Sequence, residues 1–431
     1  MYSRILKKPV FLHHPTAWLF PIFCLFCLHL AYAYQQPRWS PIDEQAHYDY
    51  IDVLTQGRLP APDADITEYT HYLTTEIFHF APADNLGLVG KSYQAQQPPV
   101  YYALLAIPNW VLKTLAVDPT QQIRLLRFIT QLFILLGCLL LIPIFKELQQ
   151  LFGIQANYGY VFACLLLCLQ LDRRYALSND NLALFLSHFS LLCLLRAWRL
   201  QQLSYVGLAS TGVTLAFLTK YSNGLLLVPL GVFLCLWGWY VRYTLRAMLS
   251  LMLVNIPLLL IPCYLLVNKL LYGDAFKNNV TQNYFASFVQ PIGNPQDFIH
   301  LFLEKLWNIN HFFNTPSVVA NISFILFVLT LLVCLLSGWR YLRATMWVAF
   351  TCGMSLLTLW VAWWLNNHYV GVYWFEFRHF NAYNLYFLLA NFGFIFFLRE
   401  IWQNNIVQIA GLLFSTLGVW ACVQAGYLLI S

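Results

Sequence analysis

The polar residues best suited to chemistry lie in one short segment, 40–50, directly after the first long apolar stretch of the chain. Ser40 suits the N-cap of a helix, Pro41 its first position and Asp43 the capping-box position. Asp43 and His47 are then four residues apart, so they share one face of that helix. The segment therefore predicts a short helix at the membrane boundary that carries acidic and histidine side chains.

Asp43 is the first candidate for a general base, and Glu44 beside it is the second catalytic candidate. A carboxyl group that is partly removed from water has a raised pKa, closer to the pH at which it must accept a proton. The alternative is that these acids only cap the helix. His47 could orient Asp43, bind a metal ion together with it, or form a local hydrogen bond.

A second polar segment, 172–181, interrupts two apolar stretches. It contains Arg173, Arg174 and Asp180, and charges at a membrane boundary can bind phosphate, sugar or a cation. The alternative is an ordinary exposed loop. Asp180 is the residue of most interest here, and it joins Asp43 and His47 as a candidate ligand of a divalent metal ion.

Two further cations, Lys220 and Arg378, lie singly beside apolar stretches on the same expected side of the membrane. Long basic side chains often snorkel from such positions toward the headgroups, which is one explanation of both. The other is that they neutralise an anionic lipid phosphate, for which the planar fork of arginine is well suited.

The composition indicates which elements must hold these residues. Of 431 residues, 60% are apolar and 10% are charged, whereas about a quarter are charged in soluble domains. Windows of about 20 apolar residues recur, which is the length a helix needs to cross a bilayer. The chain is therefore expected to be an all-α polytopic membrane protein. A water-soluble domain, a disordered tail and a nucleic-acid-binding module are excluded.

Eleven membrane spans are expected, with two long polar segments, 37–123 and 269–317, between them. Segment 98–115 is also apolar, but it is short and contains Pro108, so we expect an interfacial or re-entrant helix. All eleven cysteines lie in apolar stretches, and no disulfide framework is expected. The expected spans are 17–36, 124–145, 157–172, 182–198, 203–219, 223–241, 247–268, 318–338, 345–364, 380–398 and 406–428.

The positions of Lys and Arg set the expected orientation. With the N-terminus in the cytoplasm, the short inner loops hold almost only cations, and Glu147 and Glu400 are their acids. The other acidic residues, both long polar segments and the C-terminus then lie outside. We expect a multi-pass protein of the plasma (inner) membrane.

Four segments together resemble a known family of polytopic membrane proteins. Residues 41–50 (PIDEQAHYDY) resemble its P-x-D-E-x-x-H opening, and 96–102 (QQPPVYY) resemble its Q-P-P-L-Y-Y helix. Residues 218–222 (LTKYS) and 377–380 (FRHF) are similar to its L-T-K-Y and G-R-Y-L segments. This is the GT-C superfamily, which includes protein O-mannosyltransferases and the aminoarabinose transferase of lipid A.

The resemblance implies a single GT-C domain over 1–431, with its site at the outer leaflet. It implies transfer of a sugar from a polyprenyl-phosphate donor to a hydroxyl of a glycan, lipid or protein acceptor. A divalent metal ion is a possible cofactor. A single carboxylate opposite the leaving group favours in-line displacement with inversion.

By the same resemblance, Asp43 corresponds to the base and Asp180 to the acid of the second outer loop. Gln97, Tyr101 and His379 lie in the matched segments and are expected to bind substrate. Negative charge grows on the departing phosphate, and fixed cations such as those at 220 and 378 would stabilise it.

A lipid-linked-sugar flippase or transporter is the main alternative, and a noncatalytic scaffold is a third. Transporters carry internal repeats, broken helices and charges near the bilayer midplane. The ionisable residues here gather instead at the outer ends of the expected spans, which favours the transferase.

Overall fold

The computed structural model describes residues 15–36, 39, 44–61, 64–79, 90–152, 159–160, 163–164, 167, 176–240 and 244–276. Within these ranges the chain is all-α, apart from one isolated β-bridge between Asp65 and Lys91.

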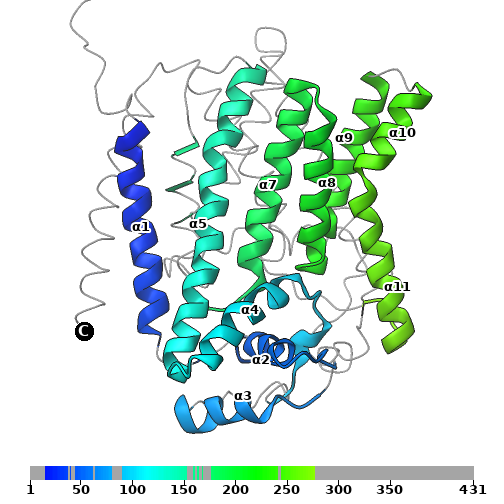
Figure 1. Ribbon diagram of the computed structural model, residues 1–431. Helices are drawn as coiled ribbons and strands as arrows, with labels where there is room; N and C mark the ends of the chain where they lie inside the picture. Colours follow the sequence, from blue (N-terminus) through cyan, green and yellow to red (C-terminus); the bar gives the residue numbers. More distant parts are fainter. Residues whose placement is uncertain are drawn as a thin grey trace, which may run out of the picture.

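Long helices form a bundle, and shorter helices lie across one of its ends (Figure 1). The bundle contains α1 (Pro15–Gln35), α5 (Pro119–Phe152), α7 (Asn179–Leu200), α8 (Leu203–Phe217), α9 (Leu227–Tyr240), α10 (Leu245–Val254) and α11 (Leu260–Tyr272). The end is covered by α2 (Glu44–Thr55), α3 (Glu68–Tyr72) and α4 (Val100–Thr114), with the short helical segments η2 (Leu73–Ile77) and η4 (Tyr93–Gln96).

Three helical stretches in the described ranges are long and apolar enough to cross a membrane: Pro119–Leu151, Asn179–Leu200 and Tyr221–Gly238. The last combines η5 (Tyr221–Leu226) with most of α9. The bent pair Leu245–Val254 and Ile256–Tyr272 raises this number to four if it forms one span. These helices indicate an integral membrane protein, as the composition predicts.

The expected spans 124–145, 182–198 and 223–241 overlap these three stretches. The expected spans 17–36 and 203–219 coincide with the shorter apolar helices α1 and α8. Segment 157–172 is described at only five positions, and the four spans expected after residue 317 lie outside the described residues.

The expected span 247–268 corresponds to this bent pair, whose helix is broken at Asn255 with an angle of 56° between its two parts. Pro257, just after the break, has no N–H to donate to the preceding turn. Asn255 Nδ2 donates to the carbonyl of Leu251 at 2.7 Å, and Ser210 of α8 donates to Asn255 Oδ1. These contacts hold the break against α8.

The bundle core is apolar, and small residues allow close helix contacts. A side chain at Gly137 of α5 would lie 3.3 Å from the backbone of Phe185 in α7. At Gly212 of α8 it would clash with Ser190 of α7. Such small residues let membrane helices approach closely. No cysteine of the described ranges is in a disulfide bond.

Helix α4 occupies the expected segment 98–115. It is 15 residues long, contains Pro108 and is not among the candidate spans of the described chain. Its buried face, which includes Tyr102 and Leu105, packs toward α2, whereas its opposite face exposes Ile107 and Trp110. A helix that packs one face against the protein and exposes apolar side chains on the opposite face suits the membrane interface.

Candidate functional site

Glu44, at the start of α2, lies in a fully buried ion pair with Arg127 of α5. Arg127 Nε donates to Glu44 Oε1 at 2.8 Å, and Arg127 Nη2 donates to Glu44 Oε2 at 2.7 Å. The amide of Leu177, just before α7, also donates to Oε1 at 2.9 Å. Arg127 Nη1 donates to the carbonyl of Gln36 after α1 at 2.5 Å. The Glu44–Arg127 pair therefore connects α2 and α5 with the residues after α1 and before α7, which suits an anchor better than a free proton acceptor.

Asp180 and Lys220 form a second buried ion pair, between the first turn of α7 and the end of α8. Lys220 Nζ lies 2.5 Å from Asp180 Oδ1, and the two residues are 9% and 2% exposed. The Ser178 hydroxyl accepts from the Asp180 amide at 3.3 Å and caps α7. Lys220, expected as an isolated cation, is thus buried and paired, so snorkelling does not describe it.

Hydrogen bonds to backbone carbonyls bring four of the sequence-predicted segments together around this pair. The Val100 amide, at the start of α4, donates to the carbonyl of Leu218 at 3.0 Å. Asn179 Nδ2 donates to the carbonyl of Thr219 at 3.2 Å. The carbonyl of Gln97 accepts from the Tyr50 hydroxyl of α2 at 3.3 Å. Four separate parts of the sequence therefore meet at one end of α7 and α8.

Polar atoms without a partner occur at this meeting point. Thr219 Oγ1, Ser222 Oγ and Gln97 Oε1 are buried and make no hydrogen bond within the described part of the chain. Thr219 is fully buried and directly precedes Lys220. Buried polar groups in proteins are usually satisfied, so a cluster of exceptions calls for an explanation such as a ligand.

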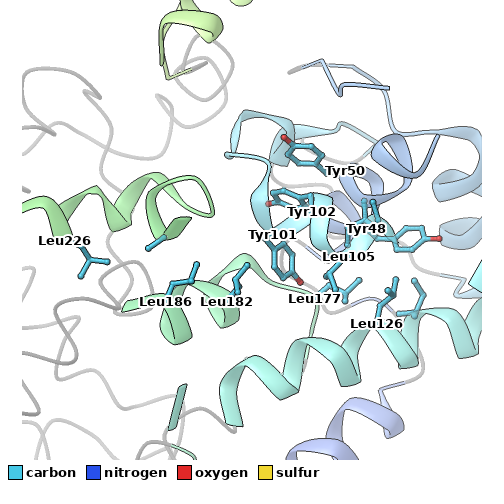
Figure 2. Close-up of a cluster of buried hydrophobic side chains, with 14 of the residues drawn as sticks. Tyr48, Tyr50, Tyr101, Tyr102, Leu105, Leu126, Leu177, Leu182, Leu186 and Leu226 are labelled. Carbon is cyan, nitrogen blue, oxygen red and sulfur yellow. The ribbon is translucent and has the colours of Figure 1, made fainter. Parts of the chain in front are cut away.

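Aromatic side chains from α2 and α4 pack beside these segments, in the cluster drawn in Figure 2. The rings of Tyr50 and Tyr102 stack with centroids 3.9 Å apart, and His47 stacks on the same Tyr102 ring. His47 Nδ1 lies 2.9 Å from the Tyr102 hydroxyl. Tyr101 is fully buried with its hydroxyl 3.4 Å from that of Thr130, and burial raises its pKa. Tyr101 thus lies in the buried core close to Ser178 and Asp180.

The structure adds two acids of α2 that the sequence analysis does not single out. Asp49 and Asp52 are fully buried. Asp49 Oδ1 accepts from the Thr67 amide at 2.7 Å, and burial raises the pKa of Asp49, which its hydrogen-bond donors partly oppose. Asp52 pairs with Lys113 of α4 and accepts from the Thr67 hydroxyl at 3.0 Å. The sequence feature that could have identified these two acids is their spacing of three residues, which places both on one face of the helix.

No group of three or more His, Cys, Asp or Glu side chains in the described ranges could hold a metal ion. His47 and Asp180 are recorded in separate hydrogen bonds, to Tyr102 and to Ser178 and Lys220 respectively. The remaining candidate residues lie outside the described residues: Asp43, Arg173, Arg174, Arg378 and His379.

This arrangement offers a buried cation, a buried carboxylate and unpaired hydroxyl and amide oxygens at the end of apolar helices. Such groups can hold a phosphate at headgroup depth and hydrogen-bond to a hydroxyl-rich substrate. Comparison with known proteins finds no match among protein-family models, curated proteins or solved structures.

Proposed function

We propose that the chain is an integral-membrane glycosyltransferase of the GT-C type. It moves a sugar from a polyprenyl-phosphate donor to an acceptor hydroxyl at the outer face of the plasma membrane. The eleven-span topology expected from the sequence, with the N-terminus inside and the C-terminus outside, belongs to this proposal. The observation that carries it is the buried Asp180–Lys220 pair at the meeting point of segments 97–100, 178–180 and 218–220.

Lys220 is the group that would meet the donor phosphate. It lies at the end of α8, where a prenyl chain can remain among apolar helices while its phosphate reaches the polar end of the bundle. A phosphate bound there would share the ammonium with Asp180. When the sugar–phosphate bond breaks, charge grows on the phosphate, and a fixed cation in a site of low dielectric stabilises it.

Asp43 is the proposed base. It directly precedes Glu44 in the sequence, so the contacts of Glu44 bear on where Asp43 lies. Glu44 accepts from the amide of Leu177, three residues before Asp180. One anchor therefore connects the segment that carries the proposed base with the segment that carries Asp180, which supports placing both in one site. The base removes the acceptor proton as the hydroxyl oxygen attacks the sugar carbon opposite the leaving phosphate.

The test is purification of the full chain, identification of its bound lipid by mass spectrometry, and a transfer assay with that lipid as donor. We expect release of the lipid phosphate coupled to glycosylation of an acceptor. Lys220→Met should abolish transfer. Lys269→Met is the matched control, because Lys269 is exposed near the end of α11 and should leave transfer unchanged.

A lipid-linked-sugar transporter is the second candidate, and the break between α10 and α11 favours it, since transporters use discontinuous helices at their binding sites. Reconstituted vesicles distinguish the two functions. A transporter would move a labelled lipid-linked sugar between leaflets without cleaving it, whereas a transferase would release the lipid phosphate.

A further inference from the structure

A compact group of charges lies at the ends of α5 and α7 that point away from α2 and α4 (Figure 1). Glu147 of α5 is buried and accepts from two arginines of α7. Arg199 Nε donates to Glu147 Oε2 at 2.5 Å and Arg199 Nη2 to Oε1 at 3.3 Å. Arg196 Nε donates to Oε1 at 3.1 Å. One carboxylate thus fixes two guanidinium groups side by side.

The charges in this group do not cancel. Two guanidinium groups share one carboxylate, and Lys146, the neighbour of Glu147, is exposed. The side chains of Arg196 and Arg199 are 36% and 30% exposed. Neither Nη atom of Arg196, nor Nη1 of Arg199, has an acceptor in the part of the chain that the structure describes. Preorganised N–H donors and net positive charge therefore remain available at the surface.

Aromatic and apolar side chains surround these arginines. Trp198 lies between them in the sequence, is 37% exposed, and packs its ring against Phe233 and Trp237 of α9. The ring of Tyr205 lies under the Arg196 guanidinium. Tryptophan and tyrosine concentrate at the headgroup level of membranes. Arginines beside such rings are typical of the depth of lipid phosphates, and the adjacent exposed Trp198 ring offers apolar surface to acyl chains.

We propose that Arg196 and Arg199 bind the headgroup phosphate of an anionic phospholipid in the inner leaflet, at the end of the bundle away from the proposed transferase site. The guanidinium N–H groups that Glu147 leaves unused donate to the phosphate oxygens, as guanidinium groups commonly do. The excess positive charge selects an anionic lipid over a zwitterionic one. The exposed apolar surface selects a membrane lipid over a soluble phosphate.

The experiment titrates delipidated full-length protein in detergent with phosphatidylglycerol, phosphatidylcholine or glycerol phosphate, and reads bound lipid by native mass spectrometry. Arg196→Gln should weaken phosphatidylglycerol binding about fivefold, the effect of about one basic residue near a charged lipid surface. Glu147 keeps its contacts to Arg199 in this variant. The matched control is Arg58→Gln, an exposed arginine after α2, which should bind as wild type does.

Several results would overturn the proposal. These are wild-type phosphatidylglycerol affinity in Arg196→Gln, equal affinity for phosphatidylcholine, or displacement of the lipid by glycerol phosphate at a similar concentration. A measurement on the wild type alone gives a check if the variant fails to fold. Phosphatidylglycerol binding should weaken as salt rises, because screening reduces the attraction, and a salt-independent affinity would also count against the proposal.

Discussion

Loss of Arg127 should strongly destabilise the protein. Arg127→Met removes both guanidinium contacts to Glu44 at 2.8 and 2.7 Å and leaves the carboxylate buried without its cation, although the Leu177 amide still donates to Oε1. Breaking a buried ion pair by removing one partner costs about 3–5 kcal/mol, because the other charge stays in a medium of low dielectric. We expect a loss of this size in the free energy of unfolding.

Equilibrium unfolding in mixed detergent and SDS micelles, followed by circular dichroism, measures this loss. Arg124→Met is the matched control, because Arg124 lies on the same helix, stacks on the ring of Tyr34 and forms no ion pair within the described ranges. That contact is worth about 0.5–1 kcal/mol at a partly exposed site. The double variant Glu44→Gln/Arg127→Met removes both charges and should be more stable than Arg127→Met alone.

Two results would contradict this prediction. One is a loss of stability in Arg127→Met no larger than that in Arg124→Met. The other is a double variant less stable than Arg127→Met, since the penalty comes from an unpaired charge on Glu44.

Three other predictions concern the second ion pair, the buried acid of α2 and the topology. Lys220→Met should lower the thermal unfolding temperature, and adding Asp180→Asn should restore much of it without restoring transfer. Burial raises the pKa of Asp49 in the folded protein above its ordinary value of 3.8. The protonated carboxyl therefore stabilises the fold below pH 3.8, and this stabilisation is lost as pH rises through the folded-state pKa. Asp49→Asn should reduce the fall in unfolding temperature over this pH interval. Single cysteines at Asp63 and Gln296, in a background without reactive thiols, should both react with an impermeant maleimide in intact cells, whereas labelling of only one would contradict the topology.

Local sequence patterns predicted much of the helical framework. The apolar windows located α5, α7 and α9, and the short apolar length of 98–115 agrees with the 15-residue helix α4. The break in 247–268 was missed because hydropathy averages over a window. The break depends on one proline and on Asn255, whose partner Ser210 comes from another helix.

The candidate site was predicted in its residues but not in its pairings. Residue types and spacing pointed to Glu44, Asp180 and Lys220. The partner of Glu44 is 83 residues away on α5, and that of Asp180 is 40 residues away after α8. Such pairs depend on how helices pack, which the sequence of either segment does not contain. Arg127 was missed for this reason, since an arginine in an apolar helix gives no local sign of its partner.

The most direct test of the central claim follows the fate of the donor. Purified protein in vesicles is supplied with its own co-purified lipid-linked sugar and an acceptor extract, and free lipid phosphate is measured over time. We expect lipid phosphate to appear in step with glycosylated acceptor, and Asp43→Asn to stop both while the protein remains folded. Movement of the intact lipid-linked sugar across the bilayer, with no release of lipid phosphate, would contradict it.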